Sequence, residues 1–228
     1  MNPLVSIVVV TYNRAHFLKD ALDSILRQTF KDYEIVLVDD GSTDNTKEIV
    51  EQYEGIRYIY QEHGGISKAR NSAVKAAKGK WIATLDSDDL WKEQKLQKQM
   101  DYLQAHPDCR IVYTAYGNFT DILADKLDER QRNLLQIAEK WYLPSALIDT
   151  KLFSEIGLYD ETLQWGEDID WIIRLKFSRA VVEHRLDEIL YLRRVHTSNI
   201  SNSRKKLYRI DLCKMTADIY RKTRRTRK

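Results

Sequence analysis

The feature that most constrains the fold is a regular alternation of short β-branched runs with stretches of helical periodicity. The runs are almost wholly apolar, as expected of strands that are buried on both faces. They predict strands at 4–10, 34–38, 56–60, 81–85 and 110–114. Apolar residues at helical spacing predict helices at 15–28, 47–53, 66–78 and 90–105. This order predicts an α/β fold, a Rossmann-like sandwich with a mainly parallel central sheet flanked by helices.

The alternation weakens after residue 114, where the sequence becomes polar and irregular. The elements expected there are a helix around 128–140, a strand at 144–149, a helix at 168–178, and strands at 180–182 and 189–192. Neither a repeat nor a low-complexity linker interrupts the chain. We therefore expect a single domain over 1–203, followed by a basic C-terminal helix or tail over 204–228.

Composition narrows the class of protein. Hydrophobic residues make up 43% of the 228, which is enough to bury a core. The two cysteines, Cys109 and Cys213, show no spacing typical of disulfides or zinc sites. The N-terminus lacks the basic segment of a signal peptide, and no apolar stretch approaches the ~20 residues of a membrane span. These features predict a cytoplasmic protein.

The C-terminal tail is strongly basic. Residues 204–228 carry a net charge of +9, against +3 for the whole chain, so the body is acidic. The apolar residues of the tail fall near one helical face. Two interpretations are open: a solvated terminal helix, or an interfacial helix that holds the protein peripherally on an anionic membrane surface. Because no nucleic-acid-reading motif is present, a nucleic-acid partner is not expected.

Polar clusters follow three of the predicted strands. They are Thr11-Tyr12-Asn13-Arg14, Asp39-Asp40 and Asp86-Ser87-Asp88-Asp89. In open parallel sheets, ligands bind outside the carboxyl ends of the strands. The three clusters should therefore converge at one edge of the sheet and form a binding site.

The cluster Asp86-Ser87-Asp88-Asp89 has two interpretations when it is taken alone. It could be a turn that caps the following helix, because Asp and Ser are ordinary turn residues. It could also hold Mg²⁺ or Mn²⁺, since these cations prefer oxygen ligands and share them with substrate phosphates. Three adjacent carboxylates repel one another, and a bound cation would relieve that repulsion.

Other segments carry weaker signals. Asp39 could cap a helix or accept hydrogen bonds from a nucleotide, but no glycine-rich motif of dinucleotide enzymes or P-loop NTPases is present. Glycines and cations in 63–71 could bind a diphosphate at a helix N-terminus. Glu167 and Asp168 follow Trp165, and partial desolvation would raise carboxylate pKa values toward the range of a general base. His196 alone is an ordinary surface or core histidine.

Taken together, these segments resemble glycosyltransferase family 2, whose members have the GT-A nucleotide-sugar fold. The resemblance rests on Val5–Arg14, Val36–Asp44, Gly65–Asn71, Leu85–Asp89, Trp165–Asp168, His196 and Ser201. It spans roughly residues 4–201, and the ordered set is far more specific than any single piece. It implies a nucleotide-binding half over 1–114 and an acceptor half over 115–203.

The resemblance also implies roles for individual residues. The residues expected to bind the nucleotide or the donor sugar are Thr11, Tyr12, Arg14, Asp39, Arg70, Asp86, Ser87 and Asp89. Asp39 would contact the base, usually uracil. Asp88 would hold Mn²⁺ or Mg²⁺ on the diphosphate, with His196 completing that site. Asp168 would be the general base, and the neighbouring Glu167 would bind acceptor or donor.

The function implied is an inverting transfer of sugar from a nucleotide-diphosphate sugar, typically a UDP-sugar, to a hydroxyl of a glycan or lipid-linked acceptor. Two alternatives are open. A sugar-nucleotide pyrophosphorylase would need a glycine-rich loop after the first strand, whereas Thr11-Tyr12-Asn13-Arg14 contains no glycine. A sugar-nucleotide or glycan-binding module without turnover would not need an intact set of acidic residues. Donor sugar and acceptor are not specified by the sequence.

Overall fold

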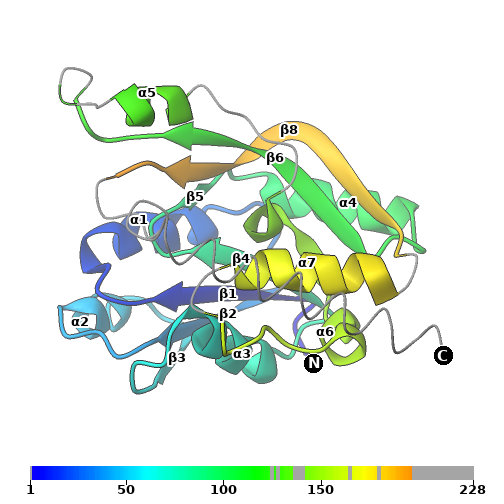
Figure 1. Cartoon of the computed structure of the whole chain (residues 1–228), viewed down its shortest axis with the longest axis horizontal. Coiled ribbons are helices and arrows are strands. Elements are labelled where there is room, and N and C mark those ends of the chain that lie inside the picture. Colours follow the sequence, from blue (N-terminus) through cyan, green and yellow to red (C-terminus); the bar gives the residue numbers. More distant parts are fainter. Residues whose placement is uncertain are drawn as a thin grey trace.

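The computed structural model describes residues 2–123, 126, 129–135, 142–163, 166–178 and 181–196 (Figure 1). Trp165, Ser201 and the basic tail 204–228 lie outside these residues, as do parts of the helix expected around 128–140. The prediction of a C-terminal helix therefore stays a prediction. Within the described residues, no helix has the length and apolarity needed to cross a bilayer.

The centre of the structure is an eight-stranded sheet, with the strand order β3-β2-β1-β4-β7-β6-β8-β5. The strands are β1 (Val5–Thr11), β2 (Tyr33–Asp39), β3 (Ile56–Tyr60), β4 (Trp81–Asp86), β5 (Leu90–Trp91), β6 (Ile111–Phe119), β7 (Leu147–Asp149) and β8 (Glu183–Arg194). The neighbours β3, β2, β1 and β4 pair in parallel, and β6 pairs in parallel with β8. In this sheet β7 and β5 run against their neighbours. The prediction of a mainly parallel sheet is therefore confirmed.

Helices cover both faces of the sheet. They are α1 (Ala15–Leu26), α2 (Thr46–Val50), α3 (Ile66–Ala76), α4 (Lys95–Ala105), α5 (Glu129–Leu135), α6 (Lys151–Ile156) and α7 (Glu167–Ser178). Side chains from α1, α2 and α4 pack on one face, and side chains from α3, α6 and α7 pack on the other. Figure 1 shows α7 lying across the strands, above α3 and α6. The expected sandwich is confirmed.

Strand β1 shows why its sequence is apolar at almost every position. Val5, Ile7 and Val9 face the α1 side, whereas Val8 faces the α3 side, because successive side chains of a strand point to opposite faces. Each is at most 1% exposed. Full burial of a valine or isoleucine contributes about 1.5–3 kcal/mol. A strand covered on both faces therefore does not show the alternation of apolar and polar residues that is typical of a strand with one face in water.

The segment 90–105 departs from its predicted helix. Leu90 and Trp91 form β5, which pairs antiparallel with Leu192 and Tyr191 of β8, and α4 begins only at Lys95. The amide of Trp91 also donates to the Ser24 hydroxyl at 3.2 Å. Partners that are distant in sequence thus override a local helical pattern.

The second half of the sheet is more extensive than predicted. Strand β6 continues to Phe119 and β8 runs from Glu183 to Arg194, whereas shorter strands were expected at 110–114 and 189–192. Residues 181–182 precede β8 and are not strand. The segment 144–149 divides into a 3₁₀ turn, Leu143–Ser145, and the short strand β7. Helix α6 was not predicted.

Candidate functional site

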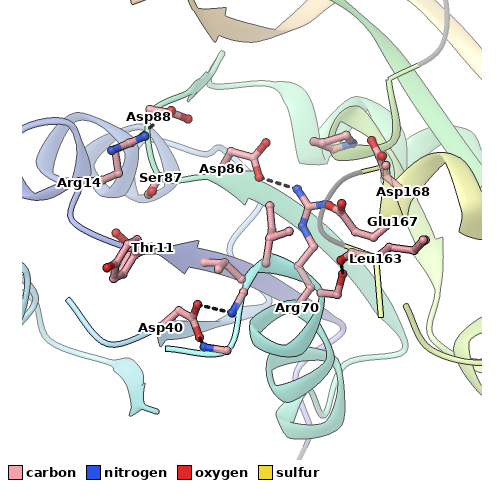
Figure 2. Close-up of a pocket in the computed structure, with 18 of the residues that line it drawn as sticks. Thr11, Arg14, Asp40, Arg70, Asp86, Ser87, Asp88, Leu163, Glu167 and Asp168 are labelled. Carbon is pink, nitrogen blue, oxygen red and sulfur yellow. Dashed lines mark hydrogen bonds and ion pairs between the residues drawn. The ribbon is translucent and has the colours of Figure 1, made fainter. Parts of the chain in front are cut away.

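A cavity of about 1100 Å³ lies at the carboxyl ends of β1 and β4, beside the N-termini of α3 and α7 (Figure 2). A binding, catalytic or metal-ligating role was predicted for twelve residues, and ten of them line this cavity. These ten are Thr11, Tyr12, Arg14, Arg70, Asp86, Ser87, Asp88, Asp89, Glu167 and Asp168. The edge of the sheet that was predicted to form a binding site is therefore the edge where the cavity lies.

Arg70 of α3 binds two carboxylates from different parts of the chain. Its Nη2 donates to Asp86 Oδ1 at 2.9 Å, and its Nη1 forms a short ion pair with Glu167 (Figure 2). Burial alone would lower the pKa of Arg70, which is 5% exposed, but Asp86 and Glu167 raise it well above the ordinary value. Arg70 therefore stays charged and joins the end of β4 to the start of α7.

Glu167 and Asp168 open helix α7. Glu167 is 4% exposed. Burial raises the pKa of the Glu167 carboxyl to about 7; Arg70 opposes this shift, and Asp168 reinforces it. Of the pair expected to be desolvated, Glu167 is buried and Asp168 is only half-buried. Asp168 lines the cavity without an ion pair to Arg70 (Figure 2), so the two neighbouring acids are placed differently.

We call residues Asp86–Asp89, between β4 and β5, the acidic loop. The Asp88 carboxylate faces the cavity mouth, where its Oδ2 lies 2.9 Å from His196 Nε2 and 3.8 Å from Arg14 Nε. Asp89 instead points inward and is 2% exposed. Its two oxygens accept hydrogen bonds from the Arg194 amide at 2.8 Å and the Tyr191 hydroxyl at 2.7 Å.

Asp88 and His196 are brought together, as the resemblance implied, although His196 does not itself line the cavity. Among the described residues, no three His, Cys, Asp or Glu side chains are grouped to hold a metal ion. Within the described part of the chain, Asp88 and His196 thus offer one carboxylate and one imidazole. Mg²⁺ sites at substrate phosphates typically use one or two protein carboxylates, with phosphates and waters as the other ligands, so these residues fit such a cation.

The loops after β1, β2 and β3 form the other wall of the cavity. The Tyr12 and His63 rings stack with centroids 4.1 Å apart and an interplanar angle of 21°. Asn13 has a φ of +50°, which Asn tolerates better than most residues. The main-chain amide of Asn13 donates to the Ser42 hydroxyl at 2.9 Å. The side-chain Oδ1 of Asn13 accepts a hydrogen bond from the main-chain amide of Thr43 at 2.8 Å.

The prediction for Asp39 needs correction, because Asp40 is the member of the pair that lines the cavity. Asp39 is 1% exposed, and its oxygens accept the Ser42 amide at 2.8 Å and the Tyr58 hydroxyl at 2.8 Å. Asp40 accepts the amides of Gly64 and Gly65 at 3.0 and 2.8 Å (Figure 2). Adjacent residues at a strand end point in opposite directions, so only one can face the cavity.

Two buried polar atoms at the cavity have no hydrogen-bond partner among the described residues: Thr11 Oγ1 and Arg70 Nε. Both belong to residues of the cavity wall. Buried polar groups in proteins are nearly always paired, so an unpaired group in a cavity wall calls for an explanation. A bound polar ligand would provide the missing partners.

Other wall residues were not predicted, among them Glu161, Leu163, Tyr142 and Arg193. Asp40 and His63 belong to segments that were expected at the site, but no role was predicted for either residue. Tyr142 donates from its hydroxyl to Asp86 Oδ2 at 3.3 Å. The glycines at 64 and 65 were a signal for their neighbour His63, but nothing in the local pattern indicated Tyr142 or Arg193, which reach the cavity through pairing of β6, β7 and β8.

Solved structures with similar folds include Staphylococcus aureus TarS 1-349 in complex with UDP-GlcNAc, with a TM-score of 0.70 and 23% identity. That match covers 89% of this chain and 61% of TarS 1-349. The mannosyltransferase PcManGT from Pyrobaculum calidifontis, in complex with GDP-Man and Mn²⁺, has a TM-score of 0.68 and 21% identity, covering 87% and 59%. The likeness confirms the expected GT-A fold.

Sequence comparison identifies the family. An uncharacterized glycosyltransferase of Rickettsia prowazekii is 35% identical over 217 residues, which covers 89% of this chain and 67% of the relative. The putative teichuronic acid biosynthesis glycosyltransferase TuaG of Bacillus subtilis is 40% identical over 120 residues, covering 50% and 47%. This chain thus spans about two thirds or less of these proteins. The model of glycosyl transferase family 2 matches residues 6–162, and the chain therefore belongs to that family of glycosyltransferases.

Proposed function

We propose that this chain transfers a sugar, with inversion at the anomeric carbon, from a nucleotide-diphosphate sugar to a hydroxyl of a glycan or lipid-linked acceptor. One observation carries the proposal: a single cavity brings together Arg70, the acidic loop and the carboxylate of Asp168. A cation-binding carboxylate, a guanidinium and a separate acid are the groups that leaving-group stabilisation and proton removal require.

The nucleotide would lie against the loops after β1, β2 and β3. The Tyr12–His63 stack supplies an aromatic surface for the base, and the unpaired Thr11 Oγ1 supplies a polar contact. Asp40 lies at this wall in the place first predicted for Asp39. Solved relatives of similar fold bind UDP-GlcNAc or GDP-Man, so we propose a nucleoside diphosphate sugar, with uracil as the first base to test.

The diphosphate and sugar would lie over Arg70, Asp86 and Ser87. Arg14 and Arg70 are cations of the cavity wall that pair with Asp88 and Asp86 of the acidic loop (Figure 2). Arg70 Nε lacks a partner among the described residues and would meet a phosphate or sugar oxygen. Asp86 would accept a hydrogen bond from a ribose or sugar hydroxyl, because its oxygens lie at the cavity wall.

We propose that Asp88 holds the divalent cation, Mn²⁺ or Mg²⁺, and that His196 either joins it or orients the carboxylate. Such a cation stabilises negative charge on the departing nucleoside diphosphate. Asp89 has no such role, because both of its oxygens bind β8.

Asp168 is the proposed general base. It accepts the proton of the acceptor hydroxyl while that oxygen bonds to the anomeric carbon and the bond between that carbon and the diphosphate breaks. Glu167 is less suited to this step, because its carboxylate is tied to Arg70 and is 4% exposed. Glu167 instead fixes the start of α7, so that Asp168 is presented to the cavity.

The acceptor would enter past Tyr142, Pro144, Glu161 and Arg193, which also line the cavity. These residues belong to the half of the chain after 114, in agreement with the proposed division into nucleotide and acceptor halves. A lipid-linked acceptor would suit a basic tail that lies on an anionic cytoplasmic membrane surface. That tail is outside the described residues.

A donor screen tests the proposal. The full chain is incubated with UDP-, GDP- and dTDP-sugars, with and without Mn²⁺, and nucleoside diphosphate release is measured. We expect release from one donor class that stops in chelator, and a product of opposite anomeric configuration by NMR. Donor binding without any turnover would favour a sugar-nucleotide binding module. Turnover undiminished by chelator would remove the cation from the proposal.

A further inference from the structure

The acidic loop is held from behind by the end of strand β8. Arg193 lines the cavity, whereas Arg194 does not, as expected of neighbouring residues in a strand. The amide of Arg194 and the hydroxyl of Tyr191 occupy the two oxygens of Asp89. The loop that presents Asp88 is therefore fastened to β8 at its last residue.

The Arg194 side chain makes a second connection to the same loop. Its Nε donates to the main-chain carbonyl of Asp88 at 3.0 Å. Its Nη2 pairs with Asp20 of α1 at 2.8 Å, and its Nη1 pairs with Asp121 just beyond β6. The guanidinium is thus bound in three directions, and Arg194 is 3% exposed.

Aromatic rings fix the plane of this guanidinium. Its Cζ lies 4.9 Å from the centroid of Phe17 and 4.8 Å from that of Phe119. A planar, delocalised cation can stack on rings and donate at its edge at the same time, which an ammonium group cannot reproduce. The direction in which Nε meets the Asp88 carbonyl is therefore well determined.

The main chain and the side chain of Asp88 are each held by a residue at or just beyond the end of β8. Arg194 holds the main-chain carbonyl, and His196 holds the carboxylate at 2.9 Å. We propose that Arg194 is a positioning residue, which fixes the backbone at Asp88 so that its carboxylate is directed at the divalent cation. This inference rests on the proposed function for the existence of that cation.

The test is Mn²⁺ affinity of the variant Arg194→Lys, measured on the full chain with saturating UDP, or GDP if the wild type binds that instead. Loss of the free Mn²⁺ signal in electron paramagnetic resonance gives the apparent Kd. Changes in residues that orient metal ligands typically cost about 10–100-fold in metal affinity or activity. We expect an apparent Kd raised about 10–100-fold, and a KM for Mn²⁺ raised in parallel while kcat at saturating Mn²⁺ stays within a few-fold of wild type.

Arg185→Lys is the matched control, because Arg185 is on the same strand and pairs with Asp187 away from the cavity. Its Mn²⁺ affinity should equal that of wild type. An Arg194→Lys protein with wild-type Mn²⁺ affinity, or with reduced kcat at saturating Mn²⁺ and unchanged affinity, would overturn the positioning role. A wild-type protein that binds no Mn²⁺ with either nucleotide would overturn the proposed cation itself, and this inference with it.

Should Arg194→Lys fail to fold, the double variant Asp20→Asn/Asp121→Asn carries the same test. These two carboxylates are 56% and 62% exposed, and the Asn side chains that replace them remove both of these charged partners from the buried Arg194 guanidinium. The guanidinium would lose the anchors of its two Nη groups and keep its stacking. We expect weaker Mn²⁺ binding in the same direction, and unchanged binding would contradict the proposal.

Discussion

Arg70 and Arg194 are both buried arginines that each pair with two acidic residues, yet they lie on different sides of the acidic loop. Arg70 lines the cavity, and the side chains of its partners Asp86 and Glu167 are 25% and 6% exposed. Arg194 lies behind the loop, and its partners Asp20 and Asp121 are 56% and 62% exposed. The same residue type thus serves two different environments.

The difference lies in where the opposing charges would go if the arginine were lost. Carboxylates around Arg70 would stay buried and unpaired, which is costly, whereas those around Arg194 would turn to water at little cost. We infer that the Arg70 cluster acts on the ligand through charge. The Arg194 cluster acts through the direction of one backbone carbonyl. Each prediction below tests one side of this comparison.

The largest effect is expected on the cavity side, from Asp168→Asn. Loss of a positioned base should lower kcat by about 10²–10⁴-fold, with little change in donor affinity. Steady-state kinetics and donor titration would measure both. Asp170→Asn on the same helix is the control, because it removes a charge paired with Arg174 outside the cavity and should leave kcat nearly unchanged. Near-normal turnover by Asp168→Asn would show that Asp168 is not the general base.

The next effect is on stability, from Arg70→Met. Removing one partner of a buried ion pair costs about 3–5 kcal/mol, so the free energy of unfolding in urea should fall by that amount. Adding Glu167→Gln should restore about 0.5–3 kcal/mol of this loss, because an unpaired buried charge is removed with it. If Arg194→Met destabilised the protein as much as Arg70→Met, the distinction between the two clusters would fail.

The two clusters should also differ in their response to pH. Burial raises the pKa of Glu167 to about 7 from an ordinary value of 4.5, so the folded state holds this proton more tightly than the unfolded state. Its contribution to stability is therefore present below pH 4.5 and is lost as the pH rises toward 7. Glu167→Gln should remove this part of the pH dependence of unfolding, and Arg194→Lys should retain it. A profile unaltered by Glu167→Gln would argue against the shift.

The smallest effect is expected from Asp121→Asn. The Asp121 carboxylate is 62% exposed, and Asp20 still pairs with the buried Arg194 guanidinium in this variant. The free energy of unfolding should therefore change by about 0–1 kcal/mol, and the difference should shrink at high salt. Urea unfolding at low and high ionic strength would measure it. A loss of several kcal/mol would show that the Arg194 cluster is as sensitive to charge as the Arg70 cluster.

Much of the fold could be predicted because the composition of strands such as β1, β2 and β4 indicates by itself that the strand is buried on both faces. Val5, Ile7, Val8 and Val9 place apolar side chains on both faces, and only a covered strand needs that composition. Strand β5 could not be predicted, because Leu90 and Trp91 become strand only through Leu192 and Tyr191, about a hundred residues away. A helical pattern in the following residues concealed it.

The site was predictable to the extent that strand ends mark it. Ten residues were correctly expected at one cavity, but the choice between Asp39 and Asp40 depends on the direction of a single side chain at the end of β2. The role of Arg194 was also beyond local patterns, since its partners Asp20 and Asp121 are 174 and 73 residues away in sequence. Contacts between residues so far apart in sequence form only when the tertiary structure is assembled.

The joined loops after β1 and β2 have a consequence for binding kinetics. Asn13 links them through Ser42 and Thr43, and the Ala15 amide donates to Asp44 Oδ2 at 3.0 Å, so the wall proposed to bind the nucleotide is cross-linked by the protein's own hydrogen bonds. Ordering a mobile side chain on binding costs about 0.5–1.5 kcal/mol, and a wall that is already ordered avoids most of this loss of entropy. Donor association at this wall should therefore need no slow rearrangement, and slow steps of the cycle should arise on the acceptor side of the cavity.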